Sequence, residues 1–97
     1  MKIISPHNKD TNWITAIIED RWVQAKVFDE PSAYGINNGR VSKLAVGKTN
    51  KQDPNKNFFN QMCYNYDRGL DFNKAPKKLI KKIVEELESL PKLFSDS

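Results

Sequence analysis

The chain has one cysteine, one histidine and no long hydrophobic run, and each shortage excludes a class of protein. Cys63 has no second cysteine for an intramolecular disulfide, which favours a cytoplasmic setting. Cys63 and His7 are the only soft metal ligands and no pair has ligand spacing, so we expect no metal and no other cofactor. No apolar run approaches the roughly 18 residues of a membrane span, and the first ten residues lack the apolar core of a secretion signal.

Residues typical of catalytic sites are equally scarce. Cys63 lies within an apolar run, where a buried and inert thiol is expected. His7 lies in residues 1–11, which we expect to be mobile and therefore a poor place for a general base. No triad or carboxylate pair is visible, so the sequence predicts a protein that is not an enzyme.

The positive charge of the chain is concentrated in one segment. The formal net charge is +4, but residues 40–82 hold eleven Lys or Arg against three Asp, a net +8, and the remainder sums to −4. Such an asymmetry suits an acidic protein partner or nucleic acid. Ordinary solubilising lysines give the same composition, so both interpretations stay open.

Four segments have the alternation, or the β-branched and aromatic content, of strands: 13–18, 22–28, 41–47 and 58–66. A short polar connection joins the first two, which predicts a hairpin. Residues 48–57 hold no apolar residue and are predicted to form an exposed loop. In the last segment, Met62, Tyr64 and Tyr66 are expected on one face of the strand.

A C-terminal helix is predicted over residues 76–90. Pro76 suits its first turn and Pro91 its end. Apolar residues recur at spacings of one, three and four and form one stripe: Leu79, Ile80, Ile83, Val84, Leu87 and Leu90. The 97 residues are therefore expected to form a single α+β domain, an antiparallel sheet of about four strands with one C-terminal amphipathic helix packed on one face.

Five lysines crowd the beginning of this helix, where cations oppose the helix macrodipole by roughly a few tenths of a kcal/mol each. A bound anion would explain them, although the apolar face alone can hold the helix. Together with the loop lysines they form the candidate nucleic-acid or anion-binding set: Lys48, Lys51, Lys56, Lys74, Lys77, Lys78, Lys81 and Lys82. Tyr64, Tyr66 and Trp22 are candidates for stacking bases on the open face of the sheet. No recognised nucleic-acid-binding motif is present.

Residues 29–44, DEPSAYGINNGRVSKL, hold the most specific chemistry. The spacing of Gly35 and Gly39 is not that of a phosphate-binding loop, and a strand rather than a helix follows. Asn37-Asn38-Gly39 instead predicts a tight turn, because Asn and Gly tolerate positive φ.

Turn geometry does not explain the charged and aromatic residues around this turn. The candidate partner-binding residues are Asp29, Glu30, Tyr34, Arg40, Tyr66 and Arg68. In a structural alternative, Asp29 or Asp67 pairs with Arg40 or Arg68 and braces the loop against the sheet.

The segment QAKVFDEPSAYGINNGRVSKL (24–44), together with YDRGLD (66–71), resembles a family of small proteins found in bacteria, phages and plasmids. Leu70 stands where that family has a Trp. The family has no established activity, so the resemblance implies a fold and a setting rather than a mechanism.

The setting implied by the resemblance is that of a small non-catalytic protein from a phage or other mobile element. Such a protein acts through protein–protein interaction, for example by inhibiting a host or defence nucleoprotein. The alternative is a nucleic-acid-binding accessory protein that uses the basic segment 40–82. A third hypothesis is a small enzyme acting on an anionic substrate, with Arg40, Arg68 and Tyr66 near a pocket.

Overall fold

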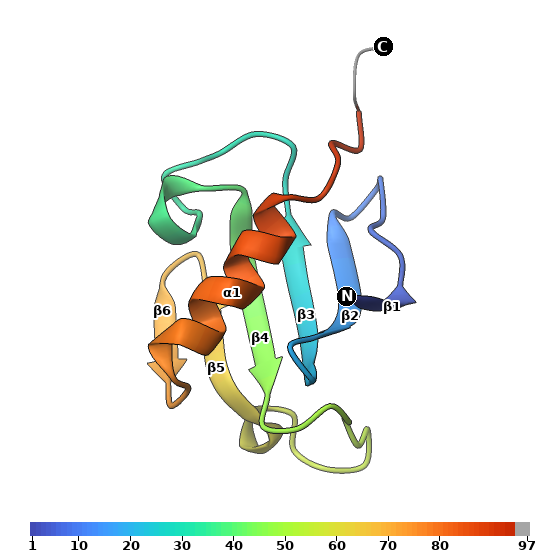
Figure 1. Ribbon diagram of the computed structural model, residues 1–97, viewed down its shortest axis with the longest axis vertical. Helices are drawn as coiled ribbons and strands as arrows, with labels where there is room; N and C mark the ends of the chain where they lie inside the picture. The colour runs from blue at the N-terminus through green and yellow to red at the C-terminus, as the bar shows by residue number, and fades with distance from the viewer. Residues whose placement is uncertain (95–97) are drawn as a thin grey trace.

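The computed structural model describes residues 1–94, which form a six-stranded sheet with one helix across one face (Figure 1). The strands follow one another in chain order and all neighbours are antiparallel. They are β1 (Lys2–Ser5), β2 (Trp13–Ile18), β3 (Arg21–Val27), β4 (Val41–Gly47), β5 (Met62–Asp67) and β6 (Leu70–Asn73), and the helix is α1 (Lys77–Glu88). The predicted α+β class, antiparallel sheet and C-terminal helix are confirmed.

The prediction of about four strands is wrong, because the sheet has a further strand at each edge. β1 pairs with β2 and lies in residues 1–11, the segment expected to be mobile. β6 pairs with β5 beyond the last predicted strand. Each has four residues and none of them is fully buried, so neither strand carries the alternating burial that marks β2 and β3 in the sequence.

Two hairpins have tight turns built on positive φ. The predicted hairpin of β2 and β3 turns at Glu19 and Asp20, with φ of 51° and 59°, which suits the right-handed twist of the two strands. β5 and β6 are joined through Arg68 and Gly69, and Arg68 has φ of 57°. The YDRG segment is therefore a hairpin turn.

The main core lies between the sheet and α1. Alternate residues of β2, β3 and β4 face the helix, including Ile14, Val23 and Leu44. The helix contributes the buried residues of its predicted apolar stripe, which are Ile80, Ile83, Val84 and Leu87. This packing, rather than the charge distribution of α1, holds the helix in place.

A smaller apolar cluster lies on the other face of the sheet and contains Trp22, Ala45 and Met62. The expectation that Met62 shares a face with Tyr64 and Tyr66 is wrong, because both tyrosines pack into the core on the helix side. The pairing of β4 with β5 shifts by one residue next to Met62. This bulge interrupts the alternation of side chains on which the expectation rests.

Candidate functional site

Arg40, just before β4, fastens residues 29–40 to the C-terminal end of α1. Its Nε donates to the carbonyl oxygen of Phe28 at 2.7 Å, and its Nη1 donates to those of Glu88 and Leu90 at 2.8 and 2.6 Å. The last turn of α1 holds no basic residue of its own. Arg40 therefore supplies, from a different element, the positive charge that a helix C-terminus favours.

The side chain of Glu88 returns the contact. Its Oε2 accepts the backbone N–H of Arg40 at 2.8 Å and that of Val41 at 3.2 Å. The guanidinium thus satisfies carbonyl groups at the helix end while the carboxylate satisfies amide groups at the strand start. We call these contacts, together with those that the Asp29 carboxylate makes to the chain after α1, the brace.

Asp29 ties the same loop to the chain that follows α1. Its carboxylate accepts the N–H of Leu93 at 2.7 Å and that of Phe94 at 2.9 Å. The hydrogen bond from Leu93 is the largest of several effects that lower the pKa of Asp29 from its ordinary value of 3.8. Glu30 adds an exposed ion pair, with its Oε1 2.7 Å from Nζ of Lys92.

The turn predicted between the two glycines is present as a short 3₁₀ helix, η1 (Ile36–Asn38). Its two asparagines adopt positive φ, 54° and 58°, while neither glycine does. The glycines serve close approach instead: a Cβ on Gly35 would overlap the carbonyl oxygen of Gly39, and one on Gly39 would overlap Oε2 of Glu88. The turn therefore fits directly against the brace.

These contacts separate the candidate partner-binding residues into two groups. Asp29 and Arg40 are engaged within the fold, through backbone groups rather than through the Asp–Arg pair that the sequence suggested. Arg68 lies apart from them, with its side chain 67% exposed and its Nε 3.8 Å from Oδ1 of the adjacent Asp67. Asp29, Arg40 and Arg68 therefore do not converge on one anion site.

Tyr34 and Tyr66 lie on the outer side of the braced loop. The hydroxyl of Tyr66 donates to the carbonyl oxygen of Tyr34 at 2.9 Å, and Tyr34 itself is 63% exposed. Tyr34 is thus presented to solvent by a loop whose backbone is fixed on both sides.

A groove of about 590 Å³ lies between α1, β5, β6 and η1. Its most exposed apolar residue is Leu70, the first residue of β6, which is 59% exposed. Leu70 is not among the candidate residues predicted from the sequence, where its only signal is an apolar side chain directly after a tight turn. The lining residues are Ile36, Asn37, Tyr64, Tyr66, Leu70, Asn73, Lys77, Ile80, Lys81, Val84 and Glu85.

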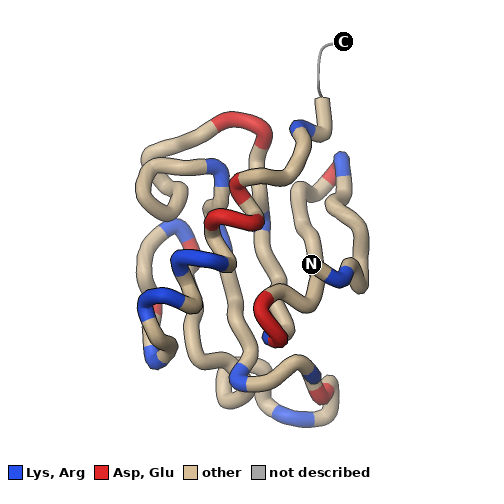
Figure 2. The backbone as a smooth tube through the Cα atoms, viewed as in Figure 1, with Lys and Arg blue, Asp and Glu red and all other residues tan. Residues whose placement is uncertain are grey.

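Five lysines lie at the helix start, and two of them, Lys77 and Lys81, line this groove. All five are exposed, and within residues 1–94 none of them forms an ion pair with a carboxylate: Lys74, Lys77, Lys78, Lys81 and Lys82. The first turn of α1 has no acidic residue and no side-chain cap. Figure 2 shows the resulting polarity, with positive residues on the first half of the helix and negative residues on the second.

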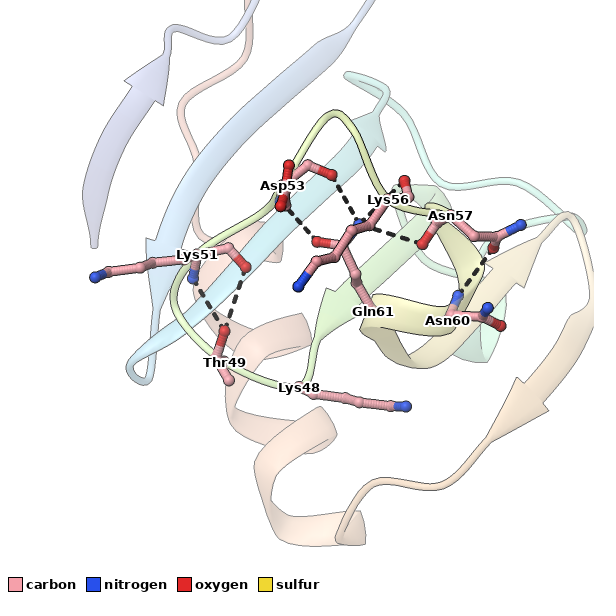
Figure 3. Close-up of a pocket in the computed structure, with 8 residues that line it drawn as sticks. All are labelled: Lys48, Thr49, Lys51, Asp53, Lys56, Asn57, Asn60 and Gln61. Atoms are coloured by element: carbon pink, nitrogen blue, oxygen red, sulfur yellow. Dashed lines mark hydrogen bonds between the residues drawn. The ribbon is translucent and has the colours of Figure 1, made fainter.

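Loop 48–57 is folded around one side chain. Gln61, at the end of η2 (Phe59–Gln61), accepts the N–H of Asp53 at 2.7 Å and donates to the carbonyl oxygens of Asp53 and Asn57 at 2.9 and 3.2 Å (Figure 3). The loop is therefore ordered by internal hydrogen bonds, although it contains no helix or strand.

The lysines of this loop do not form a single anion site. A hollow of about 650 Å³ is lined in part by Lys48, Lys51 and Lys56. The side chains of Lys48 and Lys51 extend in opposite directions (Figure 3). The loop also lies at the end of the sheet away from the brace (Figure 1). The candidate nucleic-acid set is thus divided between two regions of the molecule.

Cys63 and His7, the two residues weighed above as catalytic groups, both contact backbone carbonyl groups of the fold. Cys63 is buried, burial raises the pKa of its thiol, and its Sγ lies 3.5 Å from the carbonyl oxygens of Val46 and Gly47. Nε2 of His7 lies 2.8 Å from the carbonyl oxygen of Val27. Within residues 1–94, no three His, Cys, Asp or Glu side chains gather as a metal site, and no helix is long and apolar enough to cross a membrane.

Among known proteins, the chain shows a significant match to one family model but to no curated protein and no solved structure. A family model described as "Domain of unknown function (DUF7678)" matches residues 12–89. This range runs from the start of β2 to the end of α1 and includes the brace residues Asp29, Arg40 and Glu88 and the whole groove. The chain therefore belongs to the DUF7678 family.

Proposed function

We propose that this chain is a non-catalytic binding protein that holds an extended, acidic segment of a partner protein in the groove between α1 and β6. One observation carries the proposal: an apolar surface around Leu70 lies exposed beside lysines that have no counter-ion within residues 1–94. Each half of that observation corresponds to one part of the expected ligand.

The apolar half predicts an apolar anchor in the partner. The groove volume of about 590 Å³ falls in the range of roughly 300–1,000 Å³ that is usual for ligand sites. Leu70, Tyr66 and Val84 offer carbon surface to one or two partner side chains. Burying one such side chain contributes about 1.5–3 kcal/mol.

The charged half predicts acidic residues next to the anchor. Lys77 and Lys81 line the groove itself, and Glu85 is the one carboxylate among the described residues that line it. Complementary charges at the margin of an interface raise the association rate and select the partner. They also account for lysines that do not favour the helix on which they lie.

The edge of the sheet favours an extended conformation for the ligand. β6 is the last strand of the sheet, so one side of its backbone has no partner strand within residues 1–94. A segment laid along β6 can pair with these groups and direct alternate side chains toward the groove. The resemblance to proteins of mobile elements makes a host protein or nucleoprotein, including one of a defence system, the first class of partner to screen.

Peptide selection tests this proposal and does not require the partner to be identified first. A random peptide library displayed on phage is selected against the folded chain, and we expect the binders to combine an apolar residue with neighbouring Asp or Glu. Leu70→Asp and the double variant Lys77→Glu/Lys81→Glu should each abolish their binding. Lys48→Glu/Lys51→Glu, in the distant loop, makes the same change of charge and should leave it intact. Binders without acidic residues, or binders indifferent to Leu70→Asp, would refute the proposal.

A further inference from the structure

On the sheet face opposite α1, Phe58 packs over the buried Trp22, and aromatic rings and cations beside this cluster, including Phe59 and Lys43, remain accessible within residues 1–94. We infer that this face is a second binding surface, a stacking platform for single-stranded nucleic acid. The inference does not rest on the groove, which lies on the other side of the sheet.

Strand register places the residues of this face in rows. One row crosses the sheet through Trp13, Lys26, Lys43 and Asp67. The next runs through Thr15, Gln24, Ala45, Asn65 and Phe72. Because these positions alternate with the core residues of the same strands, both rows face away from α1. A charged row and a polar, amide-rich row thus lie side by side.

Aromatic rings are available along these rows. Phe59 is 54% exposed and packs edge-on against Phe58, with ring centroids 5.4 Å apart. A hollow of about 170 Å³ lies between these rings and Trp13. These rings replace the ones that the sequence suggested for stacking, because Tyr64 and Tyr66 lie on the helix side and Trp22 is only 9% exposed.

Cations lie next to the rings, as a nucleic-acid strand requires. Nζ of Lys43 is 6.0 Å from the ring centroid of Trp13, and Nζ of Lys26 is 5.4 Å from that of Phe28. Lys43 also lines a second hollow, of about 330 Å³, together with Lys26, Phe28, Tyr34 and Arg68. The two hollows therefore share Lys43 and continue one another.

The charge of this track favours nucleic acid over an acidic protein surface. Lys26, Lys43 and Arg68 supply three cations, and Asp67, paired with two of them, is the one carboxylate among the described residues that line either hollow. Flat rings stack on any base, and the cations between them pair with the phosphate groups. Two of the candidate partner-binding residues, Tyr34 and Arg68, find a common ligand in this arrangement.

Fluorescence anisotropy with labelled oligo(dT) and oligo(U) tests the inference. We expect binding at low salt that weakens as salt rises, with a log–log slope of about −2 for three neutralised phosphates. Lys26→Gln/Lys43→Gln should make that slope shallower by more than about one. Phe59→Ala should lower the affinity about fivefold or more at constant salt. Lys77→Gln/Lys81→Gln, which removes two charges from the other side of the molecule, is the matched control.

A second measurement needs no variant. Trp13 is half-buried on this face, whereas Trp22 is buried. Iodide should therefore quench mainly the fluorescence of Trp13, and a bound oligonucleotide should quench the same fraction. Three results would overturn the inference: no binding of either oligonucleotide at low salt, equal loss of affinity in the face and helix double variants, or equal affinity for duplex and single strand. Loss of oligonucleotide binding together with retained selection of groove peptides would overturn this inference alone.

Discussion

Replacing Arg40 by alanine removes the central contact between residues 29–40 and the end of α1. Three hydrogen bonds from a charged donor are lost, to the carbonyl oxygens of Phe28, Glu88 and Leu90. A hydrogen bond that involves a charged group contributes about 1.5–3 kcal/mol. These contacts are partly buried, so water regains access to the carbonyl groups and the losses do not add. We expect Arg40→Ala to lower the free energy of unfolding by about 2–4 kcal/mol.

Two variants separate geometry from charge in this test. Arg40→Lys keeps the charge, but a single ammonium cannot reproduce the fork that serves three carbonyl groups, so about 1–2 kcal/mol should still be lost. Arg68→Ala removes the same charge from an exposed side chain and should cost less than about 0.5 kcal/mol. Arg68 already has positive φ, and alanine is strained there to a similar degree, so the backbone adds little to the comparison.

Urea denaturation followed by far-UV circular dichroism measures these differences directly. Domain stabilities are commonly about 5–15 kcal/mol, so Arg40→Ala should lower the midpoint markedly and reduce Tm by roughly 10–20 °C. Equal losses in Arg40→Ala and Arg68→Ala would refute the argument, because the brace would then contribute no more than an exposed charge.

Two further predictions concern the same loop. Hydrogen bonds, above all the one from the N–H of Leu93, lower the pKa of Asp29 in the folded state below 3.8. The stability that ionised Asp29 contributes is therefore complete above pH 3.8 and is lost as the pH falls through the lowered pKa. Urea midpoints between about pH 5 and pH 2 should therefore fall more steeply for the wild type than for Asp29→Asn, and parallel curves would contradict this. Gly35→Ala should destabilise the protein by about 1–3 kcal/mol, because the new methyl group overlaps the carbonyl oxygen of Gly39. Gly69→Ala, whose methyl group meets open space, should change thermal stability little, and equal effects of the two substitutions would count against close approach.

The sequence predicts the elements that repeat a pattern over many residues. The helix follows from an apolar stripe that α1 buries, and the hairpin of β2 and β3 follows from two alternating runs around a polar turn. β1 and β6 do not repeat any pattern for long enough, since each has four residues at an edge of the sheet. The face of Tyr64 and Tyr66 relative to Met62 could not be predicted, because a bulge cannot be recognised from alternation alone.

The candidate site is predictable only in part, for a similar reason. Asp29 and Arg40 stand out in the sequence as chemistry that a turn does not need. Apart from the nearby carbonyl group of Phe28, their partners are backbone groups of residues 88–94, which lie 48 to 65 positions away, and backbone groups leave no mark in a sequence. The groove likewise depends on where α1 crosses β5 and β6, which no local pattern determines. The lysines beside it can be identified from the sequence, but not the apolar surface that they border.

A charge-swap measurement tests the central claim, that the groove between α1 and β6 binds an acidic segment. An acidic peptide from the phage selection and its Lys-substituted counterpart are titrated by calorimetry against the wild type, Lys77→Glu/Lys81→Glu and Leu70→Asp. We predict that the wild type binds only the acidic peptide, that the double variant binds only the basic peptide, and that Leu70→Asp binds neither. If the double variant still prefers the acidic peptide, the segment is not held beside α1 and the claim is contradicted.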